Sequence, residues 1–266
     1  MAKQESFIKF KGTLDDLTFY RLRGKYIVKK KGGVDRERIL TDPNFARVRE
    51  NMSEFTAAAK VATTFRKSLN SLIKQLGGTT VQARLMRIFR KVLNTVAGKA
   101  GQRDLVLLPN KELFSEFQFN EAKRFDSIFT ALFDVPVVDA NRNEVTWTVP
   151  VFDPAHELEM PGGTTHYRFV LATVVLSDHR HNELTETYTP RTDAAFIKRA
   201  VTYSDYLDAG VAPEAPLPLV TDLGLEAPLP DTAISITVAG VFFYKQVNGD
   251  YLTLQSEQAL QVLVVA

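Results

Sequence analysis

The sequence predicts an α+β protein in which an N-terminal β-hairpin and an αα-hairpin are followed by a C-terminal antiparallel β-sandwich. Three observations lead to this prediction. Apolar residues recur every three or four positions over 42–76 and 81–96, which is the spacing of one helix face. From residue 145 onward, short apolar runs alternate with turn residues, as in antiparallel sheets. Finally, the charge changes sign between the two halves of the chain.

The near-neutral total charge of +2 hides this asymmetry. Residues 1–103 hold 23 Lys and Arg against 8 Asp and Glu, a balance of +15, whereas residues 104–266 hold 10 against 23, a balance of −13. We therefore predict two domains. Residues 1–103 form a basic hairpin plus two-helix unit, and residues 104–266 form an acidic, β-rich sandwich with a Pro-rich arm over 211–231.

The first thirty residues contain short apolar bursts separated by turn residues. They predict strands over 7–11, 17–21 and 26–29, the last two pairing around Arg23-Gly24. A unit of two or three strands is not stable alone in water. We therefore expect it to lie on the helices or on another subunit.

The helical stretch begins at Asp42, a good N-cap, and Pro43 suits the first helical position. Its apolar stripe continues to Leu76, and Gly77-Gly78 supplies a stop that tolerates positive φ. A second helix is predicted over 81–96, and the short connection makes the pair an αα-hairpin.

The second half begins with a phenylalanine-rich region that predicts strands over 105–108 and 114–119 and a short helix over 120–133. Further strands are predicted over 145–149, 166–176, 184–188, 234–244 and 251–265. Asn248-Gly249 is a strong hairpin signal between the last two. Five prolines between Pro213 and Pro230 predict an extended arm with little regular structure.

The sequence contains none of the catalytic-site motifs that we searched for. The absence of cysteine excludes disulfides, thiolate metal sites and thiol nucleophiles. Neither a phosphate-binding glycine loop nor a Gly-x-Ser-x-Gly elbow occurs. His156 lacks the second histidine of a zinc hydrolase, and His179-Arg180-His181 is polar enough to be an ordinary turn, although on a strand both rings would share a face. We predict no enzyme, with neither catalytic, metal nor cofactor site, and we assign no role to these histidines or to His166.

The sequence also bears on membranes and location. Its N-terminal residues contain no apolar run of the kind found in signal peptides. No stretch approaches the roughly 20 apolar residues that a membrane span requires. We therefore expect a cytoplasmic protein without a membrane partner.

The first hundred residues resemble the opening of an uncharacterised bacterial family, a domain of unknown function with a hairpin followed by a long helix. The residues that carry the resemblance are Lys11-Gly-Thr-Leu, Phe19-Tyr20, Gly24-Lys-Tyr26, Lys31-Gly-Gly-Val, Arg38-Ile, Thr41-Asp-Pro-x-Phe45, Arg49-Glu-Asn51 and Glu54-Phe55. The resemblance implies a bacterial protein with a recurring N-terminal unit, and it implies no activity or cofactor.

The opposite charges of the halves favour a self-assembling structural protein, a subunit of a homopolymeric filament, tube or phage-like particle. Basic residues of one copy would contact acids of the next. The basic set is Arg21, Arg23, Lys25, Lys29, Lys30, Lys31, Arg36 and Arg38, and the acidic counter-surface is Asp205, Asp208, Glu214 and Glu226.

A nucleic-acid-binding or nucleoid-associated protein is the alternative. Rings and cations interleave in the N-terminal strands, as at Tyr20-Arg21 and Lys25-Tyr26. That composition suits base stacking together with phosphate contact. The competing interpretation is that the rings face a core while the cations form the solvated side of the hairpin.

Overall fold

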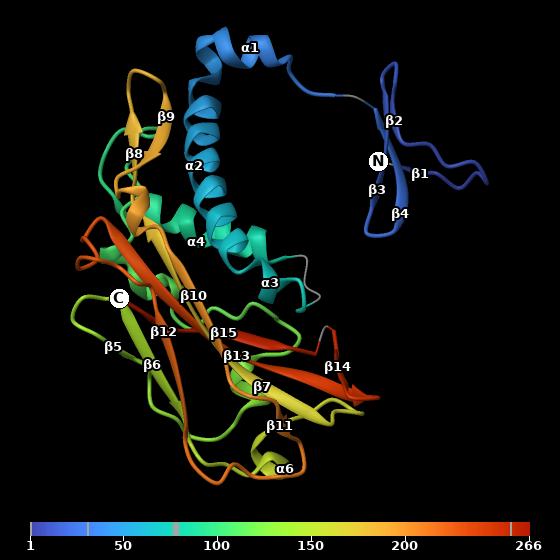
Figure 1. The fold of residues 1–266 in the computed structure, drawn as a ribbon. Helices are drawn as coiled ribbons and strands as arrows, with labels where there is room; N and C mark the ends of the chain where they lie inside the picture. Colours follow the sequence, from blue (N-terminus) through green and yellow to red (C-terminus); the bar gives the residue numbers. More distant parts are fainter. Residues whose placement is uncertain (1, 31, 77–79, 256) are drawn as a thin grey trace. The chain divides into compact units, whose positions relative to one another are not determined.

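The computed structural model describes residues 2–30, 32–76, 80–255 and 257–266 (Figure 1). Its contacts divide the chain into two compact units, Met1–Arg49 and Glu50–Ala266, here named unit 1 and unit 2. The boundary expected near residue 104 lies inside unit 2. The helices that follow residue 50 therefore belong with the C-terminal sheets.

Unit 1 carries a small antiparallel sheet with the strand order β1-β4-β3-β2. Its elements are β1 (Ala2–Lys3), β2 (Gly12–Leu14), β3 (Leu17–Leu22), β4 (Lys25–Lys30), α1 (Arg36–Thr41) and the 3-10 helix η1 (Pro43–Phe45). β3 and β4 pair with Phe19 opposite Val28. Arg23 and Gly24 join them with φ of 47° and 80°, as a two-residue type I′ turn requires.

The strand predicted over 7–11 is wrong. These residues form a loop whose base is closed by the side chain of Gln4, which accepts a hydrogen bond from the Phe10 amide at 2.9 Å and donates one to the Ile27 carbonyl at 3.2 Å. The apolar and lysine residues alternate as in a strand. Their backbone, however, is held by Gln4 and not by a neighbouring strand.

The helices of unit 2 are α2 (Ala46–Ser68), which begins in unit 1, α3 (Asn70–Ile73) and α4 (Val81–Thr95). The continuous helix predicted over 42–76 is interrupted at Leu69, where φ is −103° and ψ is 18°. Asp42 caps η1 through the Asn44 amide and so does not cap α2. The predicted stop at Gly77-Gly78 lies outside the described residues. No helix among the described residues is long and apolar enough to span a membrane.

The largest sheet of unit 2 centres on the pair β7 (His166–Ser177) and β13 (Ala233–Val247). Its other strands are β10 (Arg199–Tyr203), β11 (Leu207–Asp208), β14 (Asp250–Thr253) and β15 (Ala259–Val265). Asn248 and Gly249 turn the chain between β13 and β14, where Val247 pairs with Asp250. The strand predicted over 251–265 is therefore divided into β14 and β15.

Two smaller sheets complete the β structure of the described residues. The first, here named the small sheet, has three strands in the order β12 (Leu217–Asp222), β6 (Glu144–Val149), β5 (Val137–Val138). The second has two strands and pairs β8 (His179–Asn182) with β9 (Thr187–Pro190). Short helical turns are η2 (Leu108–Phe114), α5 (Phe125–Ile128), α6 (Pro154–Glu157) and η3 (Ala194–Phe196). The strands predicted over 105–108 and 114–119 are reduced to single bridges, and the helix over 120–133 to α5.

β7 and β13 are buried on both faces because two different layers cover them. Val174 and Ile236 face the helical layer, in the same apolar cluster as Phe65 of α2. On the other face, Phe169 shares a cluster with Trp147 of the small sheet. The structure thus confirms an α+β chain with antiparallel sheets. It does not confirm a sandwich, because helices occupy one face of the large sheet.

The Pro-rich arm over 211–231 is partly regular, which corrects the prediction. β12 lies within it and pairs antiparallel with β6, with Pro218 opposite Thr148. β12 is an edge strand of the small sheet. An edge position accepts proline because the missing N–H leaves no neighbouring strand without a partner.

Candidate functional site

The sheet of unit 1 is here named the basic sheet. None of the described residues of unit 1 is buried. The sheet nevertheless carries large apolar side chains, and Phe10, Leu14 and Leu22 are each more than half exposed. A sheet of a few strands needs a packed apolar face for independent stability.

The pairing of β3 with β4 places apolar groups on both faces, because directly opposed residues point to the same side. Phe19 and Val28 share one face with Leu17, and the ring of Phe10 lies 5.8 Å from that of Phe19. Tyr20 and Ile27 lie on the other face. Neither face is therefore a purely solvated one.

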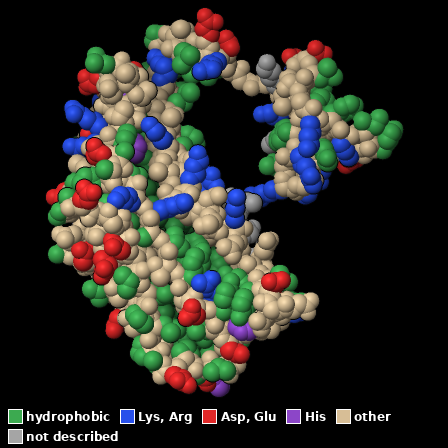
Figure 2. All heavy atoms as spheres, in the orientation of Figure 1, with side chains coloured by type: hydrophobic (Ala, Val, Ile, Leu, Met, Phe, Trp, Pro, Cys, Tyr) green, Lys and Arg blue, Asp and Glu red, His purple; other side chains and the backbone are tan. Residues whose placement is uncertain are grey.

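The predicted basic residues of β3 and β4 lie beside these apolar groups (Figure 2). The Arg21 guanidinium lies 5.8 Å from the centre of the Tyr26 ring, and the Lys29 ammonium lies 6.0 Å from that of Tyr20. The remaining described members, Arg23, Lys25 and Lys30, are exposed. Lys31 lies outside the described residues.

The two arginines of α1 are placed differently. Arg38 donates from its Nε to Asp42 Oδ2 at 3.2 Å and lies 5.7 Å from the Phe45 ring. The Asn44 amide and then Arg38 hold the pKa of Asp42 below its usual range. Arg36 is exposed on the same helix. The structure thus gathers the residues of β3 and β4 on one sheet and gives Arg38 a local partner.

The acidic counter-surface lies in unit 2. Asp205, Asp208, Glu214 and Glu226 are all exposed, on the stretch that runs from the end of β10 to the residues after β12. Asp208 also accepts a hydrogen bond from the Gly210 amide at 2.8 Å. Their contact with basic residues of a neighbouring copy stays a prediction.

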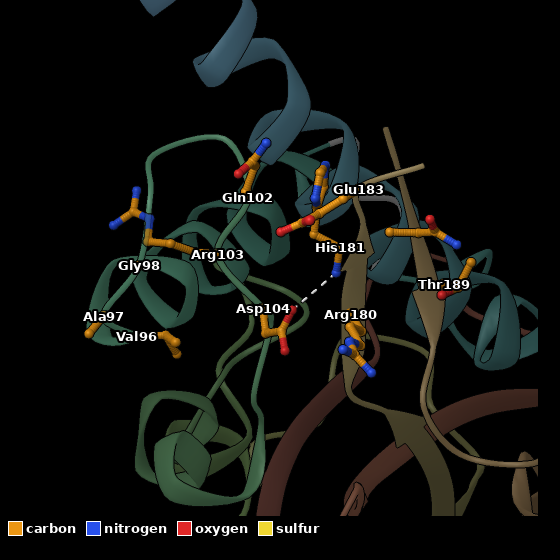
Figure 3. Close-up of a pocket in the computed structure, with 11 residues that line it drawn as sticks. Val96, Ala97, Gly98, Gln102, Arg103, Asp104, Arg180, His181, Glu183 and Thr189 are labelled. Carbon is orange, nitrogen blue, oxygen red and sulfur yellow. Dashed lines mark hydrogen bonds between the residues drawn. The ribbon is translucent and has the colours of Figure 1, made fainter. Parts of the chain in front are cut away.

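A polar pocket of about 640 Å³ lies between the segment 96–104 and strands β8 and β9 (Figure 3). Two of its charged groups, Arg103 and Asp104, already serve the fold. Arg103 donates two hydrogen bonds of 2.7 Å to the Glu54 carboxylate, which also accepts the Gly101 amide at 2.8 Å. Asp104 accepts the His181 amide at 3.0 Å. We therefore assign these groups to holding α2 and β8 against the loop.

The Glu54–Arg103 pair is almost fully buried on the carboxylate side. Burial acts to raise the pKa of Glu54, but the hydrogen bonds from Arg103 and Gly101 outweigh it, and the pKa lies below its usual value. Gly101 has a φ of 85°, and a Cβ there would meet the backbone of Glu50 at 2.8 Å. Only glycine fits this approach to α2.

His179 and His181 lie on a strand and not in the expected turn, and both are buried. Burial lowers the pKa of His179, whose Nδ1 lies 3.0 Å from the Ser177 carbonyl. The ring of His181 packs against that of Tyr188 at 5.1 Å, and neither of its nitrogens has a hydrogen-bond partner among the described residues. Within the described chain, no three His, Asp or Glu side chains are grouped as a metal ion would need.

An apolar pocket of about 390 Å³ was missed by the sequence patterns. It lies on the small sheet and is lined by residues that include Leu132, Val135 and Val137. All three side chains are largely exposed. The run from Leu132 to Val138, broken only by Asp134 and Pro136, is its signal in the sequence.

Comparisons with protein-family models, with curated proteins and with solved structures found no match. The resemblance of the first hundred residues to an uncharacterised bacterial family therefore stays a prediction.

Proposed function

We propose that the protein is a non-enzymatic structural subunit that assembles with copies of itself into a filament, tube or phage-like particle. The observation that carries this proposal is the basic sheet, whose apolar side chains are not buried within unit 1. Burial of a large apolar side chain stabilises a protein by about 1.5–3 kcal/mol relative to exposure. A second subunit that covers the sheet supplies this burial.

Charge supports the same proposal. Residues 1–49 hold 13 Lys and Arg against 6 Asp and Glu, a balance of +7, and residues 50–266 hold 20 against 25, a balance of −5. Opposite charges attract unit 1 of one copy to unit 2 of the next. A contact between two different surfaces repeats from copy to copy and gives a ring or an open filament.

The test is the mass of the particle in solution, measured by size-exclusion chromatography with light scattering at low and high salt. A mass far above the single-chain 29.8 kDa is expected, falling as salt screens the contact. The variant Lys29→Glu with Lys30→Glu should remove assembly. The matched control is Lys67→Glu with Lys74→Glu, which makes the same charge change at exposed positions of unit 2. Equal assembly by both variants would contradict the proposal.

Nucleic-acid binding is the second candidate, and the pairing of Arg21 with Tyr26 and of Lys29 with Tyr20 favours it. Both tyrosine rings are half-buried, and rings flanked by cations suit the stacking of unpaired bases with contact to phosphate. Absorbance at two wavelengths during the same chromatography distinguishes the candidates. A particle of one or two chains that elutes with nucleic acid at low salt and loses it at high salt would favour this function.

A further inference from the structure

The apolar pocket on the small sheet opens on the face that is turned away from the core. Val138 pairs with the buried Val145, whereas Val137 pairs with Thr146 and is 71% exposed. Because neighbours along a strand point to opposite faces, Val137 belongs to the outer face. Leu132, at the rim, is 94% exposed. Two such side chains beside one pocket form an apolar surface without cover in unit 2.

Acidic residues predominate in the segments that form this pocket, and Asp134 is among its lining residues. Segments 126–160 and 205–231, here named the acidic layer, contain every lining residue of the pocket together with β5, β6 and β12. They hold 13 Asp and Glu and a single Lys or Arg, Arg142. Arg142 is itself paired with Asp231 at 3.2 Å. A partner complementary to this pocket would present an apolar projection flanked by cations, because the pocket is apolar and its segments are acidic.

The loop between β1 and β2 of unit 1 is such a projection. Phe7 at its tip is 94% exposed and Ile8 beside it is about half exposed. Lys3, Lys9 and Lys11 flank the tip in the sequence against one acid, Glu5, so residues 3–11 carry a balance of 3 − 1 = +2. Gln4 closes the base of the loop, and the Ile8 amide donates to Ser6 Oγ at 3.3 Å. A loop that is ordered before binding loses less entropy when it docks.

We propose that Phe7 and Ile8 of one copy dock into the pocket at Val137 of a neighbouring copy, with the lysines of the loop facing its acidic layer. This inference rests on the proposed self-assembly and names the two surfaces through which it occurs. Every copy carries both surfaces. A head-to-tail use of these surfaces continues from subunit to subunit, whereas a reciprocal use closes in a pair of copies.

Disulfide trapping tests the contact directly, because the sequence contains no cysteine that would compete. Phe7→Cys and Val137→Cys are prepared as separate variants, mixed and oxidised mildly. The control mixture replaces Val137→Cys with Leu184→Cys, at a position 96% exposed between Glu183 and Glu186 of unit 2. Peptide mass spectrometry then measures the disulfides that join the two different chains. We expect positions 7 and 137 to be joined in far higher yield than positions 7 and 184.

The outcomes separate the docking surface from assembly itself. If the wild type assembles but positions 7 and 137 are joined no more often than 7 and 184, the docking surface is wrong and assembly stands. If the wild type keeps the mass of a single chain at every concentration, both proposals are wrong.

A second pair of variants measures the energetic contribution of the pocket. Val137→Asp and Leu184→Asp each add one acid at an exposed apolar position, and only the first lies in the pocket. We expect Val137→Asp to weaken assembly about 30-fold or more, as for the loss of an interface hot spot. Leu184→Asp should change it less than about threefold. Equal effects would overturn the assignment of the pocket.

Discussion

The two units differ in how their antiparallel sheets are covered. In unit 2, helices cover one face of β7 and β13 and the small sheet covers the other. In unit 1, a sheet with the same kind of pairing has no buried residue among those described. Strand pairing is thus of the same kind in both units, and what differs is the apolar cover of the paired strands.

The largest expected effect contrasts two phenylalanines. Phe65 is fully buried between α2 and the large sheet, whereas Phe19 lies on the open basic sheet. Phe65→Ala should lower the free energy of unfolding by about 3–5 kcal/mol. Trp147, the single tryptophan, is buried in unit 2, so its fluorescence during urea unfolding reports on that unit. Phe19→Ala should shift this transition by less than about 0.5 kcal/mol. Similar shifts for the two variants would contradict the comparison.

The next effect concerns the carboxylate that ties α2 to the segment 96–104. Glu54→Ala leaves Arg103 without its partner and should lower the free energy of unfolding by about 3 kcal/mol or more. Because the pKa of Glu54 is lowered in the folded protein, the stabilisation is present above the usual carboxyl pKa and is lost as pH falls through the folded value.

The control for Glu54 removes both charges. The double variant Glu54→Ala with Arg103→Met should be more stable than Glu54→Ala alone, because no buried charge is left without a partner. Glu37→Ala, at an exposed position of α1, should have no measurable effect on the same Trp147 transition. If the double variant were less stable than the single one, the buried pair would not explain the loss.

The sequence predicts the central strands and the helical stretches well, because their apolar patterns follow from burial. β6, β7 and β13 lie where their apolar runs place them. β12 was missed because its prolines indicate a loop, and an edge position makes them acceptable. β8 was missed because its residues are polar, although His179 and His181 are buried. Which face of a strand is buried depends on the elements that pack against it, and the periodicity of the sequence does not identify those elements.

The candidate sites were predictable only in part. The basic residues of β3 and β4 stand out from their composition, and the structure places those that it describes on one sheet. The change of charge sign near residue 103 does not coincide with the division of contacts at residue 49, because surface charge does not determine which apolar faces meet. The pocket at Leu132 and Val137 was missed because an apolar run in the sequence predicts buried side chains. Only the structure shows that these side chains are exposed.

A smaller effect contrasts buried and exposed aspartates. Burial raises the pKa of Asp178 to about 6. The hydrogen bond that Asp178 accepts from the Leu107 amide at 2.7 Å acts to lower this pKa but is outweighed by burial. Between about pH 4 and pH 6, Asp178 is protonated in the folded protein and ionised in the unfolded chain. The free energy of unfolding therefore falls as pH rises through this window. We expect a fall of about 2 kcal/mol in urea unfolding between pH 4.5 and 7.5.

Asp178→Asn keeps the acceptor for Leu107 and removes the titration, so this variant should lose that part of the pH dependence. Asp15→Asn makes the same substitution in the exposed turn after β2 and is the matched control, compared over the same pH range. An Asp178→Asn protein with the same fall in stability as the wild type would show that another group titrates.

Phe7→Ala should have the smallest effect on folding stability and, at the same time, a large effect on assembly. Phe7 is 94% exposed, so Phe7→Ala should change the free energy of unfolding by less than about 0.5 kcal/mol when measured on dilute single chains. The same variant should weaken assembly about 30-fold or more in sedimentation velocity experiments, because it removes the ring that we propose to dock into the pocket of the neighbouring copy. Leu184→Ala, equally exposed in unit 2, should change neither quantity. A large loss of folding stability in Phe7→Ala would mean that this ring packs within its own chain, and unit 1 would then resemble unit 2 in covering itself.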